Sequence, residues 1–153
     1  MPDSPPGQTA NQQIVITRVF DAPRDLVFRA WTDPDHVAKW FGPEAFDIPR
    51  DSVVIDLRVG GRFELRMVSS QMGFDTRLVY EILDLVEPEL LVLRHEPKPD
   101  LGIPDATVTR VELHDENGKT RMVLTDGPYL ESGHAEAGWS QAFDKLAALV
   151  SAG

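Results

Sequence analysis

Residues 20–43 read FDAPRDLVFRAWTDPDHVAKWFGP and contain two helix starts in close succession. Pro23 and Pro34 stand in the opening turns, where a missing N–H costs nothing, and Asp33 caps the second helix. Each helix has one apolar face and only about 8 to 10 residues, too few to be stable alone. The rest of the chain must therefore supply a larger apolar surface against which both helices pack.

Alternating apolar and polar residues on both sides of the helix pair indicate that this surface is a β-sheet. Period-two alternation places the apolar side chains of a strand on one face. Strands are predicted at residues 14–20, 53–59, 62–67, 74–86, 90–96, 107–114 and 121–126. The dipeptide Asn117-Gly118 predicts a tight hairpin between the last two. The sheet would have about seven antiparallel strands.

The last predicted element is a helix at residues 132–152, the one helix long enough to cover a sheet. Its apolar stripe consists of Ala135, Trp139, Ala142, Phe143, Leu146 and Val150. The predicted fold class is α+β, with a curved antiparallel sheet wrapped around this C-terminal helix and two short helices after the first strand. A curled sheet seldom closes tightly on one helix, so we expect a pocket between them, near residues 42–43.

Composition limits the classes of partner. The 153 residues predict one domain at residues 13–152 after a disordered tail at residues 1–12. A net charge of −10 argues against nucleic acid as a partner. No apolar run approaches the ~20 residues of a membrane span and no signal peptide is recognisable, so we expect no membrane insertion. Because the chain has no cysteine, the cytoplasm is the expected location.

Four segments of the chain match a known family. They are residues 20–43, the hairpin VGGRF at 59–63, the strand YEI at 80–82, and GW at 138–139 with FDKL at 143–146. In these segments the chain resembles the SRPBCC superfamily of START-like, helix-grip domains. Within it, the chain is similar to the bacterial branch related to the C-terminal domain of the Hsp90 ATPase activator Aha1. The resemblance extends over residues 13–152.

The resemblance implies a deep, mostly apolar cavity between the sheet and the C-terminal helix. Lipid carriers, hormone receptors, polyketide cyclases and aromatases share this fold, so the resemblance does not select one activity. It also transfers no catalytic residue to this sequence.

Large apolar and aromatic side chains are the ligand-binding candidates, because rigid rings shape a cavity for flat or lipid-like molecules. They are Trp31, Trp40, Phe41, Phe63, Leu65, Met67, Phe74, Tyr80, Trp139 and Phe143. The alternative for each is that it only fills the core. Trp40, Phe41 and Trp139 are favoured as lining residues.

Three polar residues are the catalytic candidates. Strand alternation places Asp126 and His95 on the apolar faces of their strands, and Tyr80 could donate a hydrogen bond inside the same pocket. Burial would raise the pKa of an aspartate and lower that of a histidine, a combination suited to general acid–base chemistry. In the alternative reading, Asp126 ends a strand and His95 lies at a sheet edge in water.

No motif indicates a metal or a cofactor, and none is expected. The four histidines are scattered, and Glu131 with His134 makes only a pair on one helical turn. No Gly-x-Ser-x-Gly elbow is present, and cysteine nucleophiles are absent from the sequence.

Three functions stay open at this point. The first is a module that binds a small hydrophobic or aromatic molecule. The second is an enzyme of the cyclase or hydrolase kind that uses the three polar candidates. The third, ranked last, is a module that contacts an Hsp90-type chaperone. The oligomeric state does not follow from the sequence.

Overall fold

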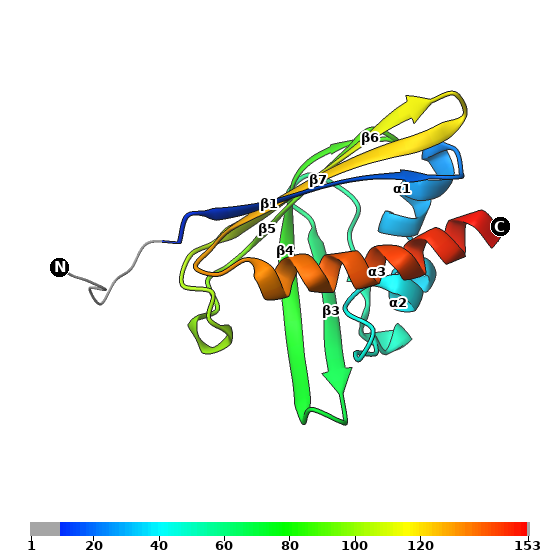
Figure 1. Ribbon diagram of the computed structural model, residues 1–153. Coiled ribbons are helices and arrows are strands. Elements are labelled where there is room, and N and C mark those ends of the chain that lie inside the picture. The colour runs from blue at the N-terminus through cyan, green and yellow to red at the C-terminus, as the bar shows by residue number, and fades with distance from the viewer. Residues whose placement is uncertain (1–9, 153) are drawn as a thin grey trace.

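The computed structural model describes residues 10–152, in which one seven-stranded sheet carries a long helix across one face (Figure 1). The strands are β1 (Gln12–Phe20), β2 (Val54–Ile55), β3 (Arg62–Ser69), β4 (Phe74–Val86), β5 (Leu90–His95), β6 (Thr107–Glu116) and β7 (Lys119–Tyr129). The helices are α1 (Arg24–Thr32), α2 (Pro34–Trp40) and α3 (Gly133–Ala152), with short 3₁₀ turns η1 (Arg50–Ser52) and η2 (Pro99–Leu101). The predicted α+β, helix-grip fold is confirmed.

The strand order is β1-β7-β6-β5-β4-β3-β2, and every neighbouring pair is antiparallel. From β2 to β7 each strand pairs with the next along the chain, which is the order that short hairpin connections produce. The first strand then pairs with the last, so β1 and the end of β7 lie together beside the start of α3. This pairing brings segments distant in sequence to one place.

The predicted strand at residues 53–59 is wrong beyond residue 55. Backbone bonds turn the chain back on itself there, from Arg58 N–H to the Asp56 carbonyl and from Gly61 N–H to the Arg58 carbonyl, both at 2.8 Å. A Cβ at Gly61 would lie 2.0 Å from the Asp56 carbonyl oxygen, so only glycine fits this turn. Leu57 and Val59, which alternate like strand residues, are exposed.

Only the end of the predicted N-terminal tail lies in the part of the chain that the structure describes. Residues 1–9 of the predicted tail lie outside the described residues. Residues 10–12 belong to the fold, since Ala10 is buried and Gln12 begins β1. The Gln12 side chain accepts a hydrogen bond from Ser132 N–H at 2.9 Å, which ties this end of β1 to the start of α3.

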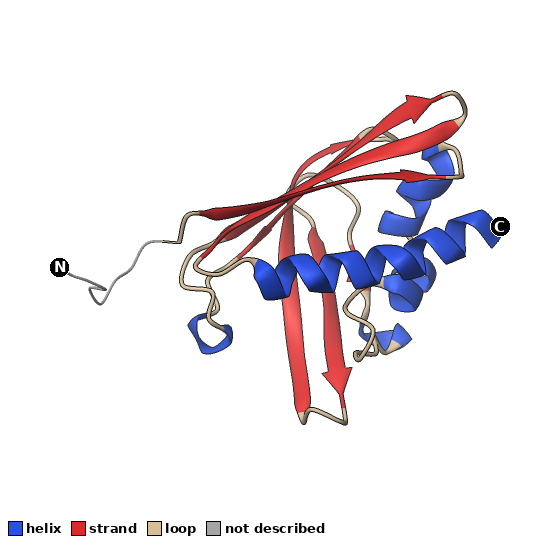
Figure 2. Cartoon of the chain, viewed as in Figure 1, coloured by secondary structure: helices blue, strands red, loops and turns tan. Residues whose placement is uncertain are grey.

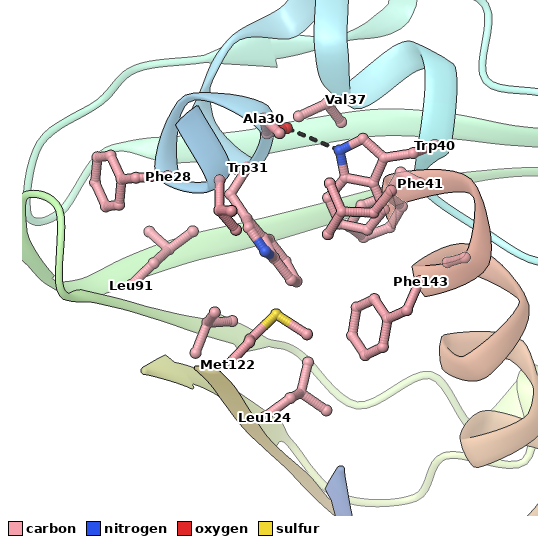
Figure 3. Close-up of a cluster of buried hydrophobic side chains, with 14 of the residues drawn as sticks. Phe28, Ala30, Trp31, Val37, Trp40, Phe41, Leu91, Met122, Leu124 and Phe143 are labelled. Atoms are coloured by element: carbon pink, nitrogen blue, oxygen red, sulfur yellow. Dashed lines mark hydrogen bonds between the residues drawn. The ribbon is translucent and has the colours of Figure 1, made fainter. Parts of the chain in front are cut away.

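Pro34 stands in the first turn of α2, as predicted, whereas Pro23 is the N-cap of α1 and not part of its first turn. Both helices pack against the rest of the core. Asp33 caps α2, its Oδ1 accepting from Asp35 N–H at 2.8 Å. Figure 2 shows α1 and α2 beside the C-terminal part of α3, on the same side of the sheet. In Figure 3, Trp31 lies between the sheet residues Leu91 and Met122 and the ring of Phe143. Within residues 10–152, no helix is both long and apolar enough to cross a membrane.

Candidate functional site

The inward side of α3 changes in character along its length. Its first half presents Ala135, Gly138 and Ala142, whereas its second half presents Phe143, Leu146 and Val150. The large residues of the second half are fully or almost fully buried and fill the space above the sheet. Small side chains in the first half cannot fill it, and a cavity is left between α3 and the sheet.

The first compartment of this cavity has a volume of about 190 Å³. It is lined by Phe41, Gly42, Pro43, Met67, Leu78, Tyr80, Thr107, Thr109, Asp126, Tyr129, His134, Ala135, Gly138, Trp139 and Ala142. The exposed His134 stands where the compartment meets the surface. The predicted position of the pocket, between sheet and helix and next to Gly42 and Pro43, agrees with this geometry.

A second compartment of about 160 Å³ adjoins the first. The two share Met67, Leu78, Tyr80, Thr107 and Tyr129 as lining residues. The second extends toward Phe74 and His95 on the sheet, toward Leu101 at the end of η2, and toward Ile103 in the loop that follows. The tyrosines therefore stand where the compartments meet.

The carboxylate of Asp126 is the most highly coordinated polar group in the cavity. Its side chain is 1% exposed, and three donors converge on it. Thr109 Oγ1 donates to Oδ1 at 2.8 Å, while Tyr129 OH and Trp139 Nε1 donate to Oδ2 at 2.6 and 2.8 Å. An ionised carboxylate is an acceptor only, so three donors are the surroundings that stabilise it.

Strand register explains how these groups meet. Met122, Leu124 and Asp126 alternate toward the interior along β7, and Thr109 lies directly opposite Asp126 on β6. Trp139 reaches the same oxygen from α3. The bond from Trp139 links the helix to the sheet at the level of the cavity.

His95 and Tyr80 form a second pair on neighbouring strands. They are register partners in β5 and β4, and their ring centroids lie 5.0 Å apart in an edge-on arrangement. His95 Nδ1 lies 2.7 Å from the Glu96 carbonyl oxygen, an acceptor, so the proton belongs on Nδ1 and Nε2 is the free acceptor. Burial lowers the pKa of His95, which keeps the ring neutral near pH 7.

The two tyrosines are held in their protonated form. Burial, and next the negative charge of Asp126, raise the pKa of Tyr80 above its usual value of 10.0. The same two causes raise the pKa of Tyr129, together with its hydrogen bond to Asp126. Both hydroxyls therefore act as donors near neutral pH and not as bases.

Of the ten predicted ligand-binding residues, five line the cavity and five lie in the core. Phe41, Met67, Tyr80 and Trp139 line the first compartment, and Phe74 lines the second together with Met67 and Tyr80. The other five are completely or almost completely buried and line neither compartment: Trp31, Trp40, Phe63, Leu65 and Phe143. Trp40, one of the three favoured lining residues, instead donates from Nε1 to the Ala30 carbonyl at 2.8 Å in the core (Figure 3).

The three catalytic candidates all face the cavity, although not one compartment. Tyr80 shares the first compartment with Asp126 and the second with His95. Asp126 lies within β7 and not at its end, and His95 is buried on β5, an inner strand of the sheet, so neither fits the alternative reading.

Sequence reasoning missed Thr107, Thr109 and Tyr129. Strand alternation along β6 gives the two threonines the same inward parity as Val111 and Leu113, and this signal could have found them. Tyr129 follows Gly127-Pro128, where alternation no longer assigns a face. Its place beside Asp126 is visible only in the structure.

Metal-binding side chains do not gather among the described residues, where no group of three or more His, Asp or Glu comes together. Glu131 and His134 stay a pair at the surface, with His134 Nδ1 3.6 Å from Glu131 Oε2.

Comparison with known proteins agrees with this architecture. The family model of the Activator of Hsp90 ATPase homolog 1-like proteins matches residues 21–151. The chain belongs to this family. That result confirms the resemblance to the Aha1-related branch over residues 21–151 of the predicted 13–152.

Several solved structures share the fold of this family member. A protein from Chromobacterium violaceum is 28% identical, with a TM-score of 0.81 over 90% of this chain and 96% of its own. The AHSA1-like protein from Aeromonas hydrophila is 22% identical, with a TM-score of 0.77 over 92% and 93% of the two chains. A protein from Nitrosomonas europaea, at 22% identity, has a TM-score of 0.76 over 91% and 94%. No curated protein matches the chain.

Proposed function

We propose that this protein binds a small, mainly apolar or aromatic molecule in the cavity beneath the first half of α3. The observation that carries the proposal is the cavity itself, bordered by aromatic and aliphatic side chains with one buried carboxylate. Ligand sites commonly combine an apolar wall with a few fixed polar groups in this way.

The size of the space supports a ligand of one or two rings. An apolar cavity of about 150 Å³ is enough to bind benzene. The two compartments, at about 190 and 160 Å³, together reach the lower end of the ~300–1,000 Å³ that is usual for ligand sites.

Filling the cavity from the helix side tests the proposal. We expect Ala135→Leu to abolish a saturable rise in melting temperature caused by small apolar compounds of one or two rings. Its matched control is Ala137→Leu, because Ala137 is exposed on the same helix and lines neither compartment. A bound ligand at a hundred times its Kd stabilises the folded state by about 2.7 kcal/mol.

Two results would contradict the binding function. One is that no compound in a broad hydrophobic library raises the melting temperature of the unaltered protein. The other is that Ala135→Leu and Ala137→Leu respond to every compound alike, since binding would then lie elsewhere.

Acid–base catalysis of the cyclase or hydrolase kind is a second candidate function. It is favoured by Tyr80, which borders both compartments and stands between Asp126 and His95. Tyr80 would serve as a proton donor and the neutral His95 as a base. Hydrolysis of aromatic esters above the solvent rate, lost in both Tyr80→Phe and His95→Gln, would support it. Equal rates in all three proteins would remove it for this substrate class.

We also propose, at lower rank, that the protein contacts an Hsp90-type chaperone and that it is located in the cytoplasm. The family takes its description from an activator of the Hsp90 ATPase, and a sequence without cysteine is compatible with the reducing cytoplasm. A pull-down with a bacterial Hsp90 that recovers none of the protein would remove the contact.

A further inference from the structure

We propose that the ligand is an organic cation, whose ammonium group binds Asp126 while its small apolar or aromatic body occupies the cavity. This inference rests on the proposed binding function and names the chemical class of its ligand. It follows from the oxygens, the charge and the rings of the first compartment.

The oxygens of Asp126 have room for one more donor. Oδ2 already accepts from Tyr129 and Trp139, whereas Oδ1 accepts only from Thr109. Two carboxylate oxygens offer about four acceptor positions, so one on Oδ1 is unused by these bonds. Since Asp126 lines the first compartment, a ligand N–H can approach it.

The charge of Asp126 has no cationic partner among the described residues. The three groups that donate to it are neutral, and no ion pair within 4.0 Å includes it. Lysine and arginine are absent from the lining of both compartments, and residues 1–9 contain neither type. A buried charge that is not paired costs free energy, which a bound cation would recover.

The basic side chains near the cavity do not replace such a cation. Lys145 directs Nζ to the Pro43 carbonyl, 3.5 Å away, and its charge interacts with Asp47 and Glu44. His134 is exposed at the surface beside Glu131, and His95 is neutral near pH 7 in the second compartment.

Aromatic rings surround the same compartment. Phe41, Tyr80, Tyr129 and Trp139 line it, from the loop after α2, from two strands and from α3. The Phe41 centroid lies 5.6 Å from that of Trp139 and 6.5 Å from that of Tyr80. Rings attract cations through their electron-rich faces, and this attraction strengthens where water is excluded. The carboxylate and the rings thus favour the same kind of ligand, a cation, and both disfavour a ligand that carries an anionic carboxylate.

Three probes that differ only in their head group test the inference: phenethylamine, propylbenzene and hydrocinnamate. They share a phenyl ring on a two-carbon chain and end in an ammonium, a methyl and a carboxylate. By titration calorimetry at pH 7 we expect phenethylamine to bind about tenfold more tightly than either of the others, as a charge-assisted hydrogen bond allows. Asp126→Asn should reduce the difference to less than about threefold, because the charge is removed.

Asp144→Asn is the matched control, since Asp144 is an exposed aspartate outside the cavity and should leave the ranking unchanged. If Asp126→Asn does not fold, the ranking in the unaltered protein decides. Propylbenzene or hydrocinnamate binding as tightly as phenethylamine would overturn the inference. Propylbenzene binding that Ala135→Leu abolishes would at the same time leave the proposed binding function intact, whereas no binding of any probe would count against both.

Discussion

The two halves of α3 face the same sheet, but the C-terminal half is tightly packed against the core and the N-terminal half borders a cavity. Over the C-terminal half, Phe143 packs against Trp31 and Trp40, and Leu146 and Val150 belong to the same buried cluster. No described residue of α3 after Ala142 lines either compartment. Over the N-terminal half, Ala135 and Gly138 leave space that Trp139 only partly occupies. The packed half stabilises the fold, and the hollow half is free to carry a site.

The two halves also differ in the number of buried polar side chains that lie beside them. The packed half buries the indole N–H groups of Trp31 and Trp40. Trp40 has a carbonyl partner, whereas Trp31 Nε1 has no partner among the described residues. The hollow half concentrates Asp126 with three donors and the pair Tyr80 and His95. A surface that must recognise a ligand keeps fixed polar groups, while a surface that only packs needs few.

A matched pair of leucine truncations measures the difference most directly. Leu146→Ala, in the packed half, should lower the free energy of unfolding by about 3–5 kcal/mol, because it removes buried methyl groups and opens a new void. Leu78→Ala, on the cavity wall, should cost about 1–2 kcal/mol, since part of Leu78 already borders open space. Urea denaturation followed by tryptophan fluorescence gives both values. Equal losses would mean that the two halves are equally packed.

The hollow half should also give stability a pH dependence through His95. Its pKa is lowered from 6.5 by burial, so below about pH 6.5 the unfolded chain binds a proton that the folded chain does not. The free energy of unfolding should therefore fall as the pH falls from about 6.5 toward the folded pKa, by at most about 1.4 kcal/mol per pH unit. Carboxylates with lowered pKa values, such as Glu64, titrate below 4.5. The loss of stability between pH 6.5 and the folded pKa of His95 is therefore not due to them.

Denaturation at pH 7 and pH 5.5 measures this slope. His95→Gln should flatten it, and His134→Gln, a change at an exposed histidine, should leave it as it is. A slope unchanged by His95→Gln would show that His95 is not held neutral in the cavity.

The smallest effect is expected at the surface of α3. Arg18 of β1 donates to Asp144 at 2.8 Å, but Asp144 is largely exposed and the pair is screened by water. Asp144→Ala should change the free energy of unfolding by less than about 1 kcal/mol. A larger loss in thermal or urea denaturation would mean that surface charge, and not the packed half, holds the helix on the sheet.

Much of the fold could be predicted because its signals are local. The prolines at residues 23 and 34, the Asp33 cap and the Asn117-Gly118 turn act within a few residues, and alternation assigns a face to each strand. The error at residues 56–59 arose where alternating residues belong to a turn that Gly61 permits.

The site could be predicted only in part. Alternation alone determined that Asp126 and His95 turn inward, and the resemblance implied a cavity beneath the last helix. The sequence could not separate Trp139, on the cavity wall, from Trp31 and Trp40, in the core, because all three are large and apolar and satisfy the same helical spacing. That separation depends on what stands opposite each ring, and the tertiary structure decided it by setting small residues of α3 above one part of the sheet and large ones above the other.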